Sequence, residues 1–239
     1  MKIAILSDIH SNLEALISVL NNLSKESFDF IISLGDIVGY GPDPEKCVDI
    51  IQREKIISIK GNHERMLIKP EDRIFANELA RRAIEWTEEN LSLKSKIFLE
   101  SLPEKYEYEG LLFVHGSPLN PDEYIIRRRV AIDSIQKIKE DGFKLCFFGH
   151  THLPGIFYED GAFSYFDKTL LEGEKYYLIN PGSVGQPRDR NPKSSYLIFD
   201  FQEYSVNLKR VEYNITNTVE KIQNYGLPEE LGTRLYYGI

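Results

Sequence analysis

All five histidines of the 239-residue chain lie in short polar segments that directly follow apolar runs. Two aspartates and one asparagine occupy the same kind of position. The eight residues are Asp8, His10, Asp36, Asn62, His63, His115, His150 and His152. Carboxylate, amide and imidazole groups without a thiolate suit Mn²⁺, Fe, Co²⁺, Ni²⁺ or Zn²⁺. The side chains therefore predict a site for divalent transition-metal ions.

The spacing of these residues indicates how they are grouped. Asp8 and His10 are separated by one residue, as are His150 and His152. In an extended segment, residues i and i+2 point to the same side, so each pair is expected to present two ligands together. The ligands are too many for one ion, which makes two ions the natural number. Asp36 is the carboxylate that we expect to bridge them.

Each of these residues also has a simpler interpretation when it is taken alone. An aspartate at the end of a strand commonly caps a turn, and asparagine is an ordinary turn residue. A lone histidine after a strand is commonly a hydrogen-bonded structural residue. These interpretations need a separate reason for every position, whereas a metal centre explains all the positions with one cause. We therefore predict the metal centre.

Four short apolar runs predict buried strands that position these residues, at 3–6, 30–34, 56–59 and 145–148. Helical patterns follow the first two runs. Ser11 and Glu14 have the spacing of a capping box, and Pro44 suits the first position of the second helix. Alternating strands and helices predict parallel pairing in a sheet that helices cover. Because ligands bind beyond the carboxyl ends of such strands, the polar segments should meet at one rim.

The rest of the chain predicts further elements of one domain. Residues 65–103 look helical, and we interpret them as a helical insertion or lid within a single domain spanning residues 1–239. Residues 106–114 resemble a hairpin around Gly110, and a helix over 132–138 ends at Gly142. Strands follow at 156–158, 176–179, 196–201 and 206–211, with the last two forming a hairpin. Asn217 is the expected start of a final helix, which ends at Gly226.

The composition bounds the class of protein. Lys and Arg number 29 against 37 Asp and Glu, a net charge of −8, and hydrophobic residues make up 42%. This profile is typical of globular proteins. The excess of acidic residues argues against binding of extended nucleic acid, although it allows one small anionic substrate.

The cysteines and the apolar runs predict a cellular location. With only two cysteines, Cys47 and Cys146, we expect neither a disulfide framework nor a thiolate metal site. The apolar runs are too short for a membrane helix, and the N-terminal run is too short for a secretory signal. We therefore expect a cytoplasmic protein that makes no contact with a membrane.

The polar segments together resemble the motifs of the calcineurin-like metallophosphoesterase superfamily, in the expected order. These motifs are Asp8-x-His10, Gly35-Asp36, Gly61-Asn62-His63-Glu64, His115-Gly116 and Gly149-His150-x-His152. Residues 35–42 and 180–188 further resemble the small bacterial and archaeal phosphodiesterase branch of that superfamily.

The resemblance implies an α/β fold, a four-layer α/β/β/α sandwich, with a centre of two divalent metal ions. Mn²⁺ is the expected metal, and Fe, Ni²⁺, Co²⁺ and Zn²⁺ are the alternatives. By the motifs, one ion would be held by Asp8, His10, Asp36 and His152, and the other by Asp36, Asn62, His115 and His150. His63 is left without a metal ion, and the resemblance makes it the candidate general acid that faces the substrate phosphate.

The resemblance implies hydrolysis of a small or nucleotide-like phosphate diester. Hydrolysis of phosphomonoesters or of dinucleoside polyphosphates is the enzymatic alternative, and a non-catalytic protein-docking scaffold is the other. Because every ligand position is filled, we favour an enzyme. Phosphoprotein phosphatases of the superfamily follow the Gly-Asp motif with Asp-Arg, whereas this chain has Gly39-Tyr40, which argues against that activity.

Two basic residues are candidates for binding the substrate. Arg127 lies at the end of a polar loop over residues 118–129, and Arg188 follows the segment 180–187. Either arginine could contact the phosphate of a small ester, and a solvated basic loop is the alternative for both. A homo-oligomer is compatible with the sequence.

Overall fold

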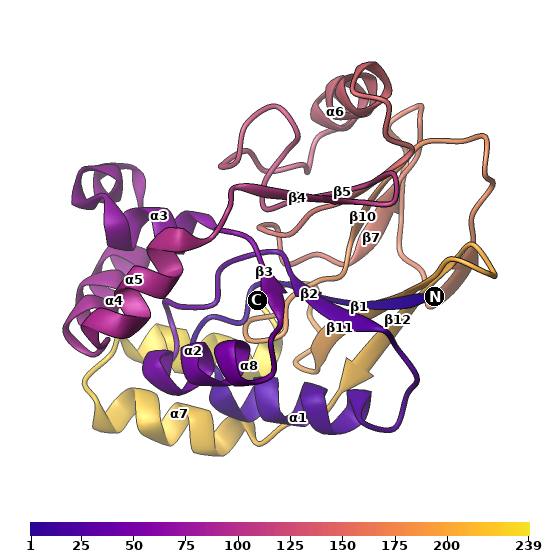
Figure 1. The fold of residues 1–239 in the computed structure, drawn as a ribbon. Helices are drawn as coiled ribbons and strands as arrows, with labels where there is room; N and C mark the ends of the chain where they lie inside the picture. Colours follow the sequence, from indigo (N-terminus) through magenta and orange to yellow (C-terminus); the bar gives the residue numbers. More distant parts are fainter.

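Two six-stranded β-sheets lie face to face in the computed structural model, which describes residues 1–239 apart from the side chain of Phe75 (Figure 1). In spatial order, the first sheet consists of β3 (Ile57–Ser58), β2 (Phe30–Ser33), β1 (Lys2–Leu6), β11 (Ser194–Asp200), β12 (Ser205–Val211) and β9 (Lys168–Leu170). The second consists of β4 (Lys105–Tyr108), β5 (Leu111–Val114), β6 (Leu145–Phe147), β10 (Tyr177–Asn180), β7 (Gly155–Phe157) and β8 (Phe163–Ser164).

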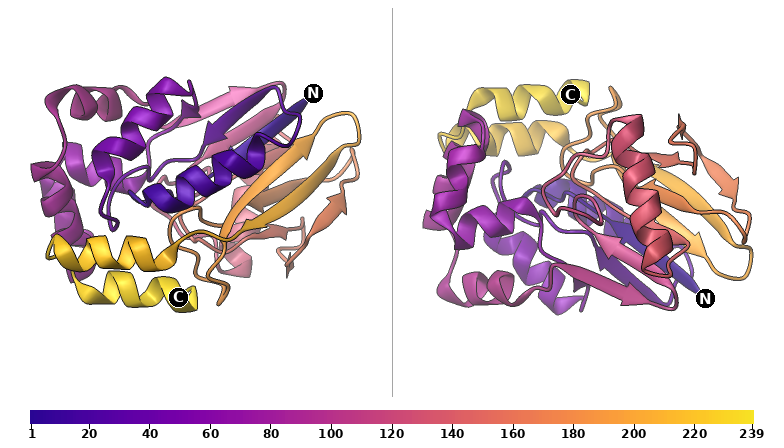
Figure 2. Two further views of the ribbon diagram at one scale, coloured as in Figure 1. Left: turned by 90° about the horizontal axis from the view of Figure 1, so that it is seen from below. Right: turned by 90° about the horizontal axis from the view of Figure 1, so that it is seen from above.

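Helices cover the outer faces of both sheets and one end of the sandwich (Figure 2). They are α1 (Leu13–Leu23), α2 (Pro44–Arg53), α3 (Asn62–Ile68), the 3-10 helix η1 (Pro70–Phe75), α4 (Glu78–Glu89), α5 (Leu93–Ser101), α6 (Arg128–Glu140), α7 (Ile215–Asn224) and α8 (Glu229–Tyr237). Among the residues described, no helix is long and apolar enough to cross a membrane.

The strands that precede the polar segments pair in parallel, as predicted. β1 pairs in parallel with β2, and β2 pairs in parallel with β3. In the second sheet, β5 and β10 both pair in parallel with β6. The carboxyl ends of neighbouring parallel strands meet at one edge of each sheet, where ligand-binding residues of open α/β sheets are found. The antiparallel pairing of β11 with both β1 and β12 makes the first sheet mixed.

The core confirms the predicted four-layer sandwich. Between the sheets, Ile3 and Ile32 of the first sheet pack in one cluster with Phe113 and Phe147 of the second. A second cluster joins the outer face of the first sheet to α1, α2 and α5, and a third joins the outer face of the second sheet to α6. The apolar strands are buried on both faces, which explains why they lack a polar alternation.

The helical segment 65–103 is divided between two cores. Leu99 and Leu102 belong to the cluster that α1 and α2 form on the first sheet, so α5 is part of the main core. Ala83 of α4 packs instead with Ile222 and Leu231 of the C-terminal helices α7 and α8. Of the described part of this segment, α3, η1 and α4 line a pocket together with Asn62 and His150. The prediction that residues 1–239 form a single domain stays a prediction.

The predicted starts of two helices are wrong. Asn12, not Ser11, caps α1, because its side chain accepts a hydrogen bond from the Ala15 amide at 3.1 Å. Asn214, not Asn217, caps α7 in the same way, and the amide of Asn217 is the donor. In both cases a nearby residue also has a capping side chain, and the pattern alone does not choose between them. The short strands β8 and β9 and the helix α8 were not predicted.

Candidate metal centre

All eight residues singled out in the sequence lie at the shared rim of the two sheets. Asp8 and His10 follow β1, and Asp36 follows β2. The other five residues follow β3, β5 and β6, with Asn62 and His63 in the first turn of α3. Asn62 is partly exposed, whereas each of the other seven is at most 5% exposed. Burying so many ionisable groups together is costly unless they are paired or bind a metal.

The side chains form two compact groups with Asp36 between them. Asp8, His10 and His152 make one group, in which the ligand atoms lie within 4.8 Å of one another. Asp36, His115 and His150 make the other group. Asn62 belongs with the second group, because its Oδ1 lies 3.0 Å from Nε2 of His115. The grouping is the one that the resemblance implies for two ions.

Asp36 is within reach of both groups. Its Oδ2 lies 3.4 Å from Nε2 of His115 and 3.6 Å from Nε2 of His10. Its Oδ1 accepts a hydrogen bond from the backbone amide of His63 at 2.9 Å, which fixes the orientation of the carboxylate. A single carboxylate between two groups of imidazoles is suited to bridge two cations.

Three of the histidines are held by main-chain carbonyls through Nδ1. The acceptors are the carbonyl oxygens of Val38 for His10 at 3.2 Å, Leu34 for His115 at 2.8 Å and Gln186 for His152 at 2.5 Å. Since a carbonyl oxygen only accepts, Nδ1 carries the proton in each ring. Nε2 of the neutral imidazole then has a free lone pair, which is the usual arrangement for a histidine that binds a metal.

The lone pairs of His10 and His152 face each other, which is the best test of whether the site fits a cation. Their Nε2 atoms are 3.1 Å apart, and Nε2 of His152 lies 3.3 Å from Oδ1 of Asp8. Burial lowers the pKa of both rings, so both are neutral. Oδ1 of Asp8 is buried and has no hydrogen-bond partner among the described atoms. Electron pairs so arranged repel one another, and a cation placed among them would remove the repulsion.

The charges of the side chains also support the conclusion that the site fits a cation. Burial opposes ionisation of Asp36, but His115 holds the pKa of this carboxyl well below its usual value. Burial also opposes charging of His115, yet the carboxylate of Asp36 raises its pKa to about 9. Both ring nitrogens of His115 therefore carry a proton when no metal is bound, and binding of a metal releases the second of these protons.

His63 lies among the candidate ligands but has a different environment. Its ring packs against those of His10 and Tyr40, with centroids 4.7 and 4.5 Å away. Burial lowers its pKa to about 4. Its Nδ1 is buried and makes no hydrogen bond to any atom that the structure describes. His63 also forms a compact group with His10 and Asp36, so proximity alone does not separate it from the ligands.

The backbone of the ligand segments is not extended, which corrects the reasoning from spacing. Asp8, His10, Asp36, His150 and His152 all have φ between 49° and 64°. Residues other than glycine rarely adopt this region, and each one costs about 1–3 kcal/mol that the surrounding structure must offset. Because the backbone turns, His150 and His152 contribute to different groups and do not present two ligands together. Asp8 and His10 share a group, as predicted.

The two arginines proposed as substrate ligands lie in different places. Arg188 lies beside the site: it donates from Nη2 to Oε1 of Gln186 at 2.8 Å, and its guanidinium lies 5.9 Å from the centre of the Tyr40 ring. Arg127 is exposed at the start of α6 and makes no capping hydrogen bond. It lies outside the group of side chains that the structure brings together. The sequence predicted a loop over residues 118–129, but in the structure this loop ends at Arg127, because α6 begins at Arg128.

Glu64 is a buried residue of the site to which the sequence assigned no role. Its carboxylate accepts three backbone N–H bonds, from Asp36 at 2.8 Å, Val38 at 3.1 Å and Gly61 at 2.8 Å. Burial and the charge of Asp36 raise its pKa to about 7. Glu64 thereby fixes the loop that carries Asp36 to the start of α3. Its position three residues after Gly61, the capping-box spacing, was the available signal.

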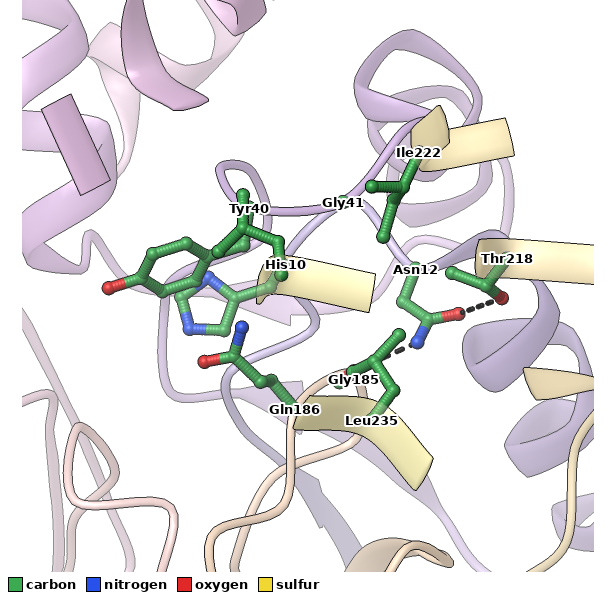
Figure 3. A pocket seen from close by; sticks show the side chains of 10 residues that line it. His10, Asn12, Tyr40, Gly41, Gly185, Gln186, Thr218, Ile222 and Leu235 are labelled. Carbon is green, nitrogen blue, oxygen red and sulfur yellow. Dashed lines mark hydrogen bonds between the residues drawn. The ribbon is translucent and has the colours of Figure 1, made fainter. Parts of the chain in front are cut away.

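The segment 180–188 and helix α7 close the back of the site (Figure 3). Asn12 donates to the carbonyl of Gly185 at 2.8 Å and accepts from the hydroxyl of Thr218 at 3.1 Å. Ser183 donates to the carbonyl of Asp8 at 2.8 Å. These bonds attach two segments from the end of the chain to the loop that carries Asp8 and His10.

Comparisons with known proteins agree with this geometry. The calcineurin-like phosphoesterase superfamily domain matches residues 1–204. A protein of Methanocaldococcus jannaschii named uncharacterized protein MJ0912 is 40% identical over 99% of this chain and 98% of its own length. The crystal structure of a metallophosphoesterase from Sphaerobacter thermophilus is 41% identical, covers 100% of both chains and superimposes with a TM-score of 0.89.

A more distant structure shares the fold. The hypothetical protein PH1004 of Pyrococcus horikoshii is 22% identical and has a TM-score of 0.83, over 100% of this chain and 98% of its own. The superfamily domain, the close relatives and the paired groups of histidine and aspartate point the same way. The chain belongs to the calcineurin-like phosphoesterase superfamily.

Proposed function

We propose that this protein is a binuclear-metal-dependent phosphodiesterase that hydrolyses a small or nucleotide-like phosphate ester. The observation that carries the proposal is the pair of ligand groups that share Asp36. Asp8, His10, Asp36 and His152 would hold one ion, and Asp36, Asn62, His115 and His150 the other. Mn²⁺ is the favoured metal for this oxygen and imidazole set, and Fe, Ni²⁺, Co²⁺ and Zn²⁺ are the alternatives.

The residues of the chain have distinct tasks in this reaction. When bound, the two ions supply an activated water and offset the charge that develops on the phosphoryl oxygens. The carbonyl-bound histidines and the carboxylate of Asp36 hold their orientations without rearrangement. Arg188 lies where its guanidinium could contact a phosphoryl oxygen, next to Tyr40. His63 would donate a proton to the departing alkoxide.

The protonation of His63 depends on the substrate. In the free protein its pKa is about 4, because burial disfavours the charged ring. A negatively charged phosphate placed against the ring favours the protonated form and raises this pKa. We therefore infer that the ring gains its proton when substrate binds.

The net charge and the cysteines bear on the kind of substrate and on the cellular compartment that we propose. With a net charge of −8, the protein suits a small substrate and not an extended nucleic acid. The two cysteines, Cys47 and Cys146, are buried free thiols, which supports a reducing compartment such as the cytoplasm.

The proposed function is tested by assaying the protein before and after metal removal. Metal-stripped and Mn²⁺-reconstituted protein are incubated with bis-p-nitrophenyl phosphate and with p-nitrophenyl phosphate. We expect activity only after reconstitution, with the diester preferred. Preference for the monoester would instead show a phosphomonoesterase. No hydrolysis of either compound would favour a non-catalytic scaffold.

Binding of metal is expected to stabilise the fold. The ligand groups repel one another when no cation is present, so an ion that binds only the folded state raises its stability. At about 1,000 times its Kd, one ligand stabilises by about 4 kcal/mol, which raises the Tm of a chain of this size by about 10 °C. Calorimetry of the stripped protein with and without Mn²⁺ measures this shift. An unchanged Tm would contradict the metal centre.

The position of His63 can be tested through a glycine. Gly39 has φ of +88°, and a Cβ at this position would lie 2.0 Å from Nδ1 of His63. We expect Gly39→Ala to displace the imidazole and to slow hydrolysis of an alkyl diester about tenfold or more, with bound metal retained. The matched control is Gly142→Ala, since Gly142 has φ of +83° and its Cβ would meet nothing within 4 Å. Equal losses in both variants would show a backbone effect alone.

A further inference from the structure

A cavity of about 520 Å³ adjoins the candidate metal centre. Asn62 and His150, both proposed ligands of the second ion, form part of its wall. The rest of the wall comes from Tyr40, from residues 65–80 of the helical segment and from residues 122–124. Pockets that enclose small organic ligands measure about 300–1,000 Å³, so this cavity has room for much more than a phosphate group.

Two tyrosine rings line this cavity from opposite groups of the metal centre. The ring of Tyr124 lies against that of His150, with centroids 3.9 Å apart. The ring of Tyr40 lies against that of His10, with centroids 4.6 Å apart. The two tyrosines come from loops of different sheets. Aromatic side chains beside a cavity are suited to stack on a planar ring such as a nucleobase.

The charges in the wall do not favour binding of a second phosphate. Among the described side chains of the wall, Arg65 is the one with a permanent positive charge, and that charge is already matched. Arg65 donates to Oε2 of Glu104 at 2.8 Å and bonds to the carboxylate of Asp122. Asp72 adds a further carboxylate to the wall. Among the described side chains of the wall, no cation is therefore left unpaired to bind a second phosphate away from the metal centre.

The remaining wall suits an uncharged organic group. Met66, Ala76 and Ala80 supply apolar surface. The amides of Asn62 and Asn77 supply hydrogen-bond donors and acceptors for the hydroxyls of a sugar or the edge of a base. Small-molecule sites usually combine apolar walls with a few placed polar groups in this way.

We propose that this cavity binds one alcohol arm of the diester and selects an uncharged, ring-bearing group of nucleoside size. The inference rests on the proposed function and goes further, because it names the chemistry of the substrate. A polyphosphate chain would find no unpaired cation among the described side chains of this wall, so the cavity favours nucleoside monophosphate esters over dinucleoside polyphosphates.

The test compares three nitrophenyl esters on the Mn²⁺-loaded full chain. They are the p-nitrophenyl ester of thymidine 5′-phosphate, the same ester with an added 3′-phosphate, and methyl p-nitrophenyl phosphate. We expect kcat/KM for the thymidine ester to exceed that for the methyl ester by about tenfold or more. The added 3′-phosphate should remove most of that advantage. Equal rates on the thymidine and methyl esters, or no effect of the added phosphate, would overturn the inference.

Two variants test the cavity directly. Tyr124 is 45% exposed, so Tyr124→Ala removes the ring at little cost to folding. We expect it to lower the ratio of kcat/KM for the thymidine ester to that for the methyl ester about tenfold. Tyr165→Ala is the control, because Tyr165 is 66% exposed and does not line the cavity. Ala76→Phe, which fills the cavity from an extended backbone position, should lower the same ratio. An unchanged ratio in both cavity variants would overturn the inference.

A binding measurement separates this inference from the proposed function. Thymidine is titrated into the unaltered protein and the Tyr124→Ala variant by calorimetry, and we expect about tenfold weaker binding to the variant. If no ester is hydrolysed but thymidine binds as expected, the proposed function is wrong, and the cavity is still supported as a site for a group of nucleoside size. If the esters are hydrolysed without selectivity and thymidine does not bind, only the assignment of the cavity fails.

Discussion

Asp36→Asn is expected to lower hydrolysis of bis-p-nitrophenyl phosphate by about 1,000-fold or more and to reduce the metal bound per chain. The carboxylate lies 3.4 Å from Nε2 of His115 and 3.6 Å from Nε2 of His10. Asparagine has the same shape and keeps an acceptor for the His63 amide, but it loses the charge that both ions share. A loss of about 4 kcal/mol of transition-state stabilisation corresponds to this factor.

The measurements are the rate and the metal content by elemental analysis after dialysis against Mn²⁺. Asp133→Asn is the matched control, because Asp133 is 56% exposed on the outer face of α6. The control should keep both its activity and its metal. An Asp36→Asn protein that retained two ions and normal turnover would show that Asp36 does not bridge. The Tm of the variant, measured without metal, checks that the fold persists.

The positions of the candidate ligands were predictable because they follow from the strands. Apolar runs of four to five residues, such as 3–6 and 145–148, are buried on both faces. The first polar residue after each run therefore marks the carboxyl end of a strand. Parallel pairing then brings the residues that follow neighbouring strands of one sheet to the same edge. His10 and Asp36 could therefore be placed together from the sequence, because they follow the parallel strands β1 and β2.

The geometry within the rim was not predictable from spacing. His150 and His152 have φ of 64° and 60°, values that the surrounding contacts impose. The amide of His150, for example, donates to Oδ2 of Asp8 at 3.1 Å. Such bonds exist only after the two sheets have come together. The spacing of His150 and His152 therefore predicted that they present two ligands together, whereas the structure places them in different groups.

The groups that support the ligands were missed for the same reason. The carbonyl of Gln186, which orients His152, follows from tertiary structure alone. Glu64 acts through three backbone amides of two separate segments. Tyr124 resembled any other loop tyrosine in the sequence, and only its ring contact with His150 and its place in the cavity wall distinguish it.

The cavity and the metal centre together give the helical segment a role in selecting substrate. The sequence predicted helices over 65–103 but not what they pack against. Of the described part of this segment, α3, η1 and α4 contribute to the wall of the cavity, whereas α5 belongs to the main core. The Ala80 side of α4 packs against the C-terminal helices. Substitutions in α4 at the cavity should therefore change the choice of ester and leave the chemistry of the rim intact.

His63→Ala is expected to slow hydrolysis of an unactivated alkyl diester by about 10²–10⁴-fold. The loss on bis-p-nitrophenyl phosphate should be less than about tenfold, because nitrophenolate leaves without a proton. His63 is not one of the seven ligands implied by the resemblance, so the variant should retain its metal. The imidazole packs against the rings of His10 and Tyr40, and we expect its removal to leave the groups that bind both ions in place.

The pH dependence gives a second measure of the acid. Burial lowers the pKa of His63 to about 4 in the free protein, and the bound phosphate raises it. An acid must be protonated, so kcat on the alkyl diester should fall as the pH rises through the pKa in the complex. His63→Gln keeps a hydrogen-bond donor that does not titrate, so this decline should disappear. Equal losses on both esters in His63→Ala, with the decline preserved in His63→Gln, would assign the proton to another group.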